Sequence, residues 1–184
     1  MPCRHSFLKV IESEKLVSKI PEPNEQCYSQ DFWGNVRLSI LTAPIANTFI
    51  QKHITPSTLG IHVRRTDFAR LGRPLSTSQM FFEAIDKVLP QCDKIFLATD
   101  DSREERRFCR RYGNRIIFTN KSENIRWSGP GRRPGMITWN TYNEALVDML
   151  IMGNCKEIFG SQGSTFSSCS ALLSPHNSKL TIIS

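Results

Sequence analysis

The sequence has no apolar run long enough to cross a membrane, and charged residues interrupt the N-terminal segment where a signal peptide would need an apolar stretch. The interrupting residues are Glu12, Glu14 and Lys15. Both absences favour a soluble protein. A chain of 184 residues can bury about two-thirds of its unfolded surface, so we expect one domain with a real core.

Cysteine pairs at metal-binding or redox spacing are also missing. The six cysteines are scattered, with no CxxC pair and no histidine nearby at metal-ligand spacing. This distribution predicts reduced, mostly buried thiols in preference to a disulfide framework, and it favours the cytoplasm. The cysteines are Cys3, Cys27, Cys92, Cys109, Cys155 and Cys169.

Acidic residues are in deficit, since 17 Asp and Glu stand against 24 Lys and Arg and the net charge is +7. The excess favours polyanionic or phosphorylated partners, although we expect most of it to be solvated surface. A nucleic-acid-binding protein is the weaker alternative, because it rests on charge alone without a recognised RNA or DNA module. Its basic residues would be Arg70, Arg73, Arg126, Arg132 and Arg133.

Internal repeats and low-complexity tracts are absent, whereas from Leu59 onward short apolar runs alternate with amphipathic segments. That alternation is typical of βαβ units and a parallel sheet. We therefore predict an α/β fold with a Rossmann-like parallel sheet and helices on both faces. The predicted strands are residues 59–64, 94–99, 115–119, 156–160 and 179–183.

Capping signals predict where the intervening helices begin and end. The first helix begins near Thr77, and Pro90 ends it. The later signals are capping boxes at Ser102 with Glu105 and at Thr141 with Glu144, glycine stops at Gly113 and Gly153, and a last helix that continues to Leu173.

Residues 1–53 do not show this alternation of apolar runs and amphipathic segments. Pro21 to Pro23 indicates a linker, and the apolar residues from Ile40 to Ile50 indicate a helix that packs on the later domain. We predict an N-terminal extension and linker helix over residues 1–53 and a Rossmann-like domain over residues 54–184. The irregular stretch from Asn120 to Trp139 is either a functional loop or a surface excursion.

The segment from Gly60 to Asp67 takes an apolar strand directly into ionisable groups. Strand alternation places His62 and Arg64 on one face and Arg65 on the other. Arg64 must find an anion, either a protein carboxylate such as Asp67 or a ligand phosphate, which a guanidinium grips bidentately. The residues alone leave both readings open.

Polar groups follow three of the predicted strands, at residues 62–67, 99–101 and 160–168. Ligands of open parallel sheets bind beyond the carboxyl ends of the strands, so we expect these groups along one edge. The third segment is a turn rich in Gly and Ser at the start of a helix. Such a helix start binds phosphate well through its free N–H groups. Ser and Thr are also ordinary N-cap residues, so the segment could serve only to begin the helix. With Arg64 it would make a diphosphate cradle.

Three carboxylates lie near these segments. Asp100 and Asp101 favour helix capping or a nucleotide hydroxyl over a metal, since hard-cation sites recruit further converging carboxylates. Asp148 is flanked by apolar residues on a predicted helix. It is either a solvated helix residue or an acceptor for a purine edge, and spacing does not decide between them.

Three motifs in this order resemble the fucosyltransferase superfamily that includes α1,2-, α1,6- and protein O-fucosyltransferases. They are GIHVRRTD at 60–67, FLATDD at 96–101 and STFSSCSALL at 164–173, the last preceded by Asp148. The resemblance implies the C-terminal, Rossmann-like lobe of a GT-B glycosyltransferase. It also implies metal-independent, inverting transfer of fucose from GDP-fucose to a glycan or protein hydroxyl.

The resemblance also implies residue roles. Arg64 would hold the β-phosphate, His62 and Asp148 would contact the guanine nucleoside, and Arg65 would support them. Asp100 and Asp101 would lie at the edge of the donor site, and Ser167 or Ser168 would complete its phosphate pocket. Ser164, Thr165 and Phe166 would also belong to the donor-binding residues. The implied catalytic residues are Arg64 and Asp67.

The chain also departs from the α1,6-type pattern. That type continues after the first motif with a Lys and a Glu that assist catalysis, where this chain has Phe68, Ala69 and Arg70. The general base is therefore unassigned. Residues 1–53 are too few for a second lobe, so a noncatalytic nucleotide-sugar-binding module is an alternative. Eukaryotic members of the superfamily work in the secretory pathway. The lumen of that pathway is therefore an alternative location to the cytoplasm.

Overall fold

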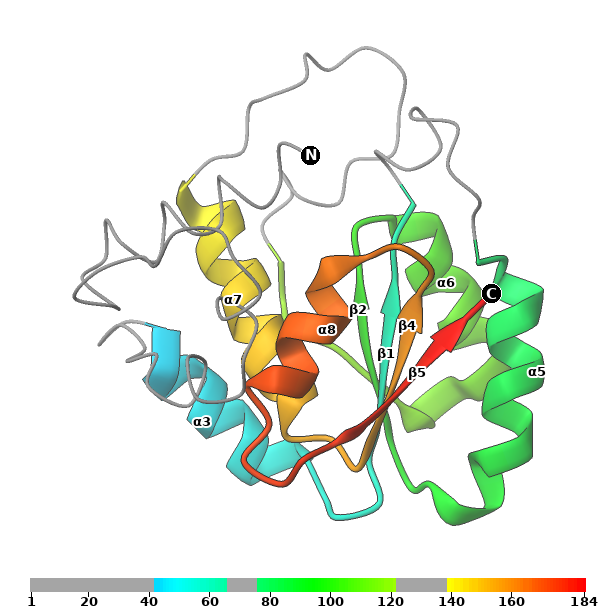
Figure 1. Cartoon of the computed structure of the whole chain (residues 1–184), viewed down its shortest axis with the longest axis horizontal. Helices are drawn as coiled ribbons and strands as arrows, with labels where there is room; N and C mark the ends of the chain where they lie inside the picture. The colour runs from blue at the N-terminus through cyan, green and yellow to red at the C-terminus, as the bar shows by residue number, and fades with distance from the viewer. Residues whose placement is uncertain (1–41, 66–75, 122–138) are drawn as a thin grey trace, which may run out of the picture.

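The computed structural model describes residues 42–65, 76–121 and 139–184. Its centre is a five-stranded sheet with the order β3-β2-β1-β4-β5, and every neighbouring pair is parallel (Figure 1). The strands are β1 (Leu59–Val63), β2 (Ile95–Thr99), β3 (Ile116–Ile117), β4 (Glu157–Ser161) and β5 (Lys179–Ile183). The predicted parallel α/β fold is confirmed.

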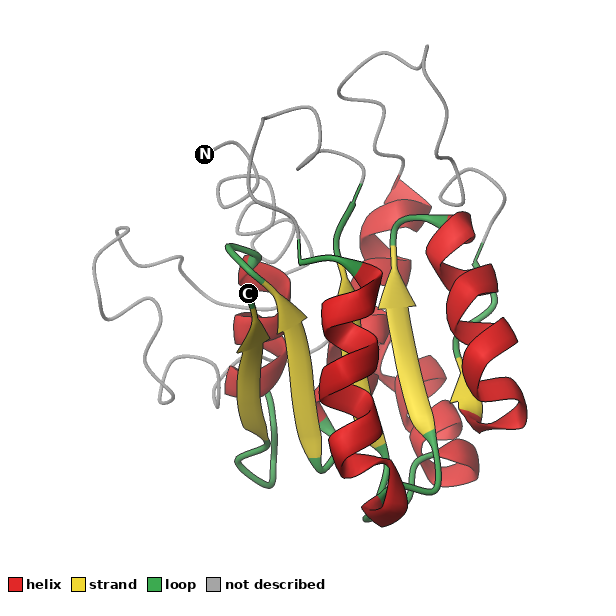
Figure 2. Ribbon diagram, turned by 90° about the vertical axis from the view of Figure 1, so that its right-hand side faces the viewer, coloured by secondary structure: helices red, strands yellow, loops and turns green. Residues whose placement is uncertain are grey.

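Helices cover both faces of the sheet, as Figures 1 and 2 show. On one face lie α5 and α6, and on the other lie α3, α7 and α8. The α-helices are α3 (Thr42–His53), α5 (Ser78–Val88), α6 (Ser102–Tyr112), α7 (Trp139–Gly153) and α8 (Thr165–Leu172), and short 3-10 turns occupy Leu89–Gln91 and Gly113–Arg115.

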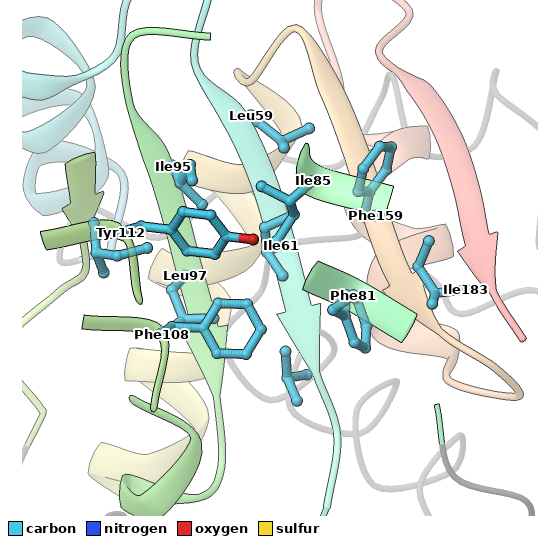
Figure 3. Packing of buried hydrophobic residues seen from close by; sticks show 12 residues of the cluster. Leu59, Ile61, Phe81, Ile85, Ile95, Leu97, Phe108, Tyr112, Phe159 and Ile183 are labelled. Carbon is cyan, nitrogen blue, oxygen red and sulfur yellow. The ribbon is translucent and has the colours of Figure 1, made fainter. Parts of the chain in front are cut away.

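Two buried apolar clusters hold these layers together. Ile61 of β1 packs with Phe81 of α5 and Phe108 of α6 in the first cluster (Figure 3). Val63 of β1 belongs to the same cluster. The second cluster lies on the other face, where Phe96 of β2 packs among residues of α3 and α7. Because strand side chains alternate, β1 contributes its odd-numbered residues to the first face and presents His62 to the second.

The strand order fixes where a ligand can bind. The chain proceeds from β1 outward to β2 and β3, then returns to the other side of β1 with β4 and β5. Neighbouring crossovers therefore diverge between β1 and β4. Such a switch point opens a crevice beyond the carboxyl ends of the two strands, and the segments that follow β1 and β4 border it.

Two helices begin at other residues than predicted. The N-cap of α6 is Asp101, whose carboxylate accepts the Arg103 N–H at 2.7 Å, so the capping box predicted at Ser102 is wrong. Ser102 is already helical because the preceding carboxylate takes the capping position. Helix α7 begins at Trp139, ahead of Thr141, so the second predicted capping box is wrong as well.

The remaining boundaries agree more closely. Thr77 caps α5, Gly113 ends α6 with a φ of 57°, and Gly153 ends α7. Strand β3 is shorter than predicted because it pairs with β2 at two positions only. Helix α3 packs against α7, as expected, but its Ile45 is 60% exposed and faces away from the core.

Some predictions lie outside the described residues: the linker at Pro21 to Pro23, Ile40, Leu41, Asp67 and most of the stretch from Asn120 to Trp139. Cys92, Cys109, Cys155 and Cys169 are thiols that form no disulfide, as predicted, whereas Cys3 and Cys27 lie outside the described residues. Among the described helices, none is long and apolar enough to span a membrane.

Candidate functional site

Side-chain oxygens take over the hydrogen bonds of β1 where its backbone ladder ends. The Ser161 hydroxyl accepts the Arg64 N–H at 2.9 Å and donates to the His62 carbonyl at 3.1 Å. On the other side, Asp100 Oδ1 accepts the Arg65 N–H at 2.9 Å. The three predicted polar segments therefore meet at one edge, with the ends of β2 and β4 tied to β1.

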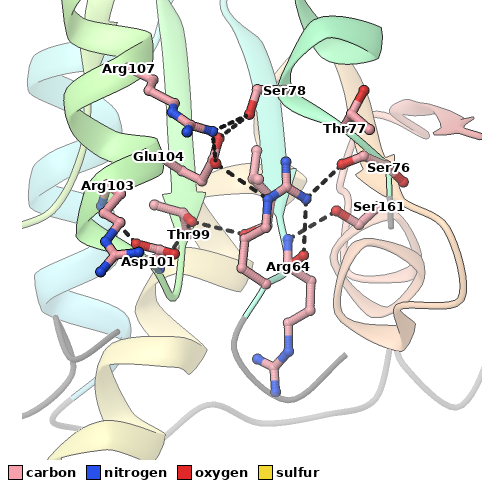
Figure 4. A network of polar contacts seen from close by, with 12 residues as sticks. Arg64, Ser76, Thr77, Ser78, Thr99, Asp101, Arg103, Glu104, Arg107 and Ser161 are labelled. Carbon is pink, nitrogen blue, oxygen red and sulfur yellow. Dashed lines mark hydrogen bonds and ion pairs between the residues drawn. The ribbon is translucent and has the colours of Figure 1, made fainter. Parts of the chain in front are cut away.

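The Arg64 side chain lies in this junction beside an acid. Its Nε is 3.4 Å from Asp100 Oδ2, and the side chain keeps 30% of its surface exposed. Figure 4 shows its guanidinium pointing away from Ser76 and Ser161. Asp100 is thus a carboxylate that contacts Arg64, and Asp67, the partner considered from the sequence, lies outside the described residues. The guanidinium remains reachable from solvent.

His62 lies on the opposite face of the sheet from the first core cluster. Its ring is 4% exposed and stacks on Phe166 of α8, with centroids 4.4 Å apart and planes inclined by 24°. Nδ1 is 3.5 Å from the Ser167 hydroxyl. Burial, and then the charges of Arg64, Lys121 and Arg65, lower the pKa of His62 well below its usual range. The imidazole is therefore neutral at physiological pH.

A glycine brings α8 this close to β4. A Cβ built on Gly160 would lie 2.6 Å from the Ser167 Cβ and closer still to its Oγ. Residues before and after Ser167 face outward to different degrees: Thr165 is exposed, and Ser164, Phe166 and Ser168 are partly buried. The start of α8 thus presents hydroxyls and backbone beside the end of β4.

Arg65 joins a polar network on the other face of the sheet, in which Figure 4 labels Ser76, Ser78, Glu104 and Arg107. Its Nη1 donates to the Ser76 carbonyl at 2.6 Å, and its Nε is 3.4 Å from Glu104 Oε1. Glu104 is 4% exposed and also accepts the Ser78 hydroxyl at 2.6 Å and an Arg107 N–H at 3.0 Å. This network fixes the end of β1 against α5 and α6.

Asp100 and Asp101 are occupied by the contacts of β1 and of the α6 cap. Among the described residues, no group of three His, Cys, Asp or Glu side chains is placed to hold a metal ion. The two adjacent carboxylates serve different partners, the Arg65 N–H for Asp100 and the Arg103 N–H for Asp101.

Asp148 is buried and fully engaged. It is 2% exposed, its Oδ1 accepts the Thr119 hydroxyl at 2.6 Å, and its Oδ2 lies 2.7 Å from Lys121 Nζ. The interpretation of Asp148 as a solvated helix residue is therefore wrong. The cause is Lys121, which follows β3 and brings a counter-charge against α7.

Two members of the site escaped the sequence patterns. Lys121 also donates to the Thr99 carbonyl at 3.1 Å, yet a single lysine after a short strand carries no local signal. Ser161 was part of the third polar segment, but nothing in the sequence indicated that its hydroxyl would replace the strand ladder. The structure brings together His62, Arg64, Asp100 and the start of α8, and places Arg65 on the other face.

Comparison with known proteins gives structural neighbours only. No family model and no curated protein sequence matches the chain. POFUT1 in complex with GDP-fucose matches with a TM-score of 0.57 and 18% identity, over 89% of this chain and 52% of that one. NodZ α-1,6-fucosyltransferase co-crystallised with GDP matches with a TM-score of 0.60 and 18% identity, over 95% of this chain and 60% of that one. Fucosyltransferase NodZ from Bradyrhizobium matches with a TM-score of 0.59 and 18% identity.

These matches confirm the fold. The chain has the Rossmann-like architecture found in GT-B fucosyltransferases, and it spans about half of the length of POFUT1. At 18% identity the likeness extends to the fold alone. The neighbours were crystallised with GDP-fucose and with GDP.

Proposed function

We propose that this chain is a fucosyltransferase-like donor-binding domain whose ligand is GDP-fucose. The observation that carries the proposal is the meeting of Arg64, His62 and the start of α8 at the switch point, through the Ser161 hydroxyl. Neighbours of the same fold have GDP-fucose or GDP in their crystals, which supports a nucleoside diphosphate as the ligand here.

The proposed roles follow from charge and exposure. The exposed part of Arg64 and the hydroxyls and amides from Ser164 to Ser168 would hold the diphosphate, since both favour an anion. The neutral His62 and the Phe166 ring stacked on it would border the nucleoside. Arg65, Asp100 and Asp101 would hold these groups in place. We also propose that the chain divides into an N-terminal extension over residues 1–53 and a donor-binding domain over residues 54–184.

The proposed reaction is inverting and independent of metal. An acceptor hydroxyl of a glycan or protein would attack the anomeric carbon of fucose while the bond from that carbon to the phosphate oxygen breaks. The bonding electrons leave with the diphosphate, and Arg64 would stabilise the charge that develops there. The hydroxyl proton needs a base, which is unassigned, and Asp67 is the remaining candidate from the first motif.

A thermal-shift screen tests the ligand. GDP and GDP-fucose should raise the melting temperature, because a ligand at 100 times its Kd adds about 2.7 kcal/mol to the stability of the native state. UDP and UDP-sugars should have little effect, GDP-mannose serves as the sugar control, and EDTA should change nothing. The absence of any shift with GDP would contradict the proposal. GDP-fucose binding without transfer to any acceptor would instead assign a noncatalytic binding module.

A further inference from the structure

Helix α6 carries five exposed arginines and no lysine. The residues that it buries are Glu104, Phe108 and Tyr112. The arginines occupy the side of the helix that faces solvent, so none of their side chains belongs to the core. They are Arg103, Arg106, Arg107, Arg110 and Arg111.

Two of these arginines have acidic partners and three do not. The Nη1 of Arg107 is 3.0 Å from Glu104 Oε1 (Figure 4), and Arg111 pairs with Asp86 of α5. Among the described residues, no carboxylate forms an ion pair with the other three, which are Arg103, Arg106 and Arg110. These three are spaced three and four positions apart, so they form one row along the helix, which we call the arginine row.

The stability of α6 does not explain the arginine row. Arg103 is the second residue of the helix, where the helix dipole favours acidic side chains and disfavours cations. Arg106 lies three positions after Arg103 and four before Arg110, and like charges at these spacings repel one another. The acidic residues Glu104 and Glu105 lie at neither spacing from any member of the row, so they do not offset this repulsion. Folding alone would favour neutral or acidic residues at these positions.

We propose that the arginine row is a docking surface for an acidic helix of another polypeptide, whose carboxylates lie three and four positions apart. Every cation of the row is an arginine, and a planar guanidinium grips a carboxylate bidentately. At about 1.5 Å of rise per residue, successive members of the row lie about 4.5 and 6 Å apart along the helix axis. A partner helix with the same spacing presents its carboxylates at the same intervals, so three ion pairs can form along one line of contact.

Two other anionic partners fit this surface less well. A helix that binds a membrane surface inserts its apolar side, but Phe108 and Tyr112 of α6 are buried in the first core cluster. Proteins that bind single-stranded nucleic acid stack its bases on aromatic side chains. Among the described residues, the exposed large hydrophobic side chains are Ile45 and Ile182, which are not aromatic and lie on other elements.

Binding of two synthetic peptides to the unmodified chain is the first test. The patterned peptide is an alanine-rich helix with glutamates three and four positions apart on one face. The scrambled peptide has the same composition, with its glutamates spread around the helix. Fluorescence anisotropy should show that the patterned peptide binds at least about threefold more tightly, since more exposed ion pairs can form with it. Equal affinities, or no binding of either peptide, would overturn the inference.

A matched pair of triple variants is the second test, and glutamine is the replacement because its helix propensity is close to that of arginine. The row variant combines Arg103→Gln, Arg106→Gln and Arg110→Gln. The control variant removes the same charge from exposed lysines outside α6 and combines Lys52→Gln, Lys156→Gln and Lys179→Gln. The row variant should bind the patterned peptide at least about threefold more weakly than the control does. Equal losses would mean that net charge alone decides binding, and would overturn the inference.

Urea denaturation separates docking from a role in the fold. At low salt the row variant should be at least as stable as the unmodified chain, because repulsion between like charges on α6 is removed. A row variant that does not fold, or that unfolds at a lower urea concentration, would show that the fold requires the arginines and would overturn the inference.

Duplex DNA and phosphatidylserine vesicles represent the other anionic partners. The unmodified chain should bind both more weakly than it binds the patterned peptide. Tighter binding of either one, lost in the row variant and kept in the control variant, would assign the surface to that partner and overturn its assignment to an acidic helix.

Discussion

The backbone N–H of Arg64 donates to the hydroxyl of Ser161, 97 positions away in the chain, at 2.9 Å. The β1–β4 ladder runs from Leu59 paired with Glu157 to His62 paired with Gly160, and the Ser161 side chain continues it after the last pair. The two strands can therefore diverge at the switch point without leaving the Arg64 N–H unsatisfied.

Arg64→Ala should weaken GDP binding. If the guanidinium holds the diphosphate, its removal should cost about 1.5–3 kcal/mol of binding free energy, as for other charge-assisted hydrogen bonds. Calorimetry measures the change. Lys179→Ala is the control, because Lys179 pairs with Glu157 at the surface of the sheet, with 75% of its side chain exposed. An unchanged GDP affinity in Arg64→Ala would remove Arg64 from the site.

Gly160→Ala should destabilise the fold. The added Cβ would lie 2.6 Å from the Ser167 Cβ, so α8 must move away from β4. Overpacking of this kind costs about 1–3 kcal/mol. Urea denaturation measures the free energy of unfolding, with Ser167→Gly as the partner variant.

The double variant Gly160→Ala with Ser167→Gly tests whether the contact itself causes the loss. Since Ser167→Gly removes the Cβ and the hydroxyl that the new methyl group meets, the double variant should be more stable than the sum of the two single changes predicts. Simple additivity would show that the two residues do not collide.

Local signals predicted the fold well because each acts over a few residues. Strand β5 has the predicted bounds, since its apolar run follows a Pro and Asn turn, and Gly113 ends α6 in the left-handed conformation that glycine favours. The capping box at Ser102 failed for a local reason as well, because Asp101 competes for the same role.

The site was only partly predictable, because its contacts join distant positions. Periodicity placed His62 and Arg64 on one face, and topology brought the three polar segments to one edge. No spacing rule could reveal that Asp148 pairs with Lys121, or that Asp100 contacts Arg64. Such partners are decided by packing of the whole chain.

Arg65 and Arg107 contact the same oxygen, Glu104 Oε1, but differ in burial. The Arg65 side chain is 12% exposed and that of Arg107 is 59% exposed. Arg65→Met should lower the free energy of unfolding by about 3–5 kcal/mol, because it leaves Glu104 buried without its inner partner. Arg107→Ala should cost about 0.2–1 kcal/mol, as for exposed pairs. Guanidinium denaturation measures both losses of unfolding free energy. Equal losses in Arg65→Met and Arg107→Ala would show that the buried arginine contributes no more to stability than the exposed one.

Acid should destabilise the native state through His62. Its folded pKa is lowered, so below the unfolded value of about 6.5 the unfolded chain takes up a proton that the buried imidazole does not. The stability contributed by the neutral ring is therefore complete above that value. It declines as the pH falls, by at most about 1.4 kcal/mol per pH unit until the folded pKa is reached.

The variant His62→Gln isolates this contribution, because glutamine has no proton to gain in this range. The difference in unfolding free energy between pH 7.5 and pH 5.5 should be smaller in His62→Gln than in the unmodified chain. His176→Gln, which removes an exposed imidazole, should keep the full difference. An unchanged acid sensitivity in His62→Gln would show that His62 accepts a proton in the folded state as readily as in the unfolded state. The neutral imidazole proposed beside the nucleoside would then be wrong.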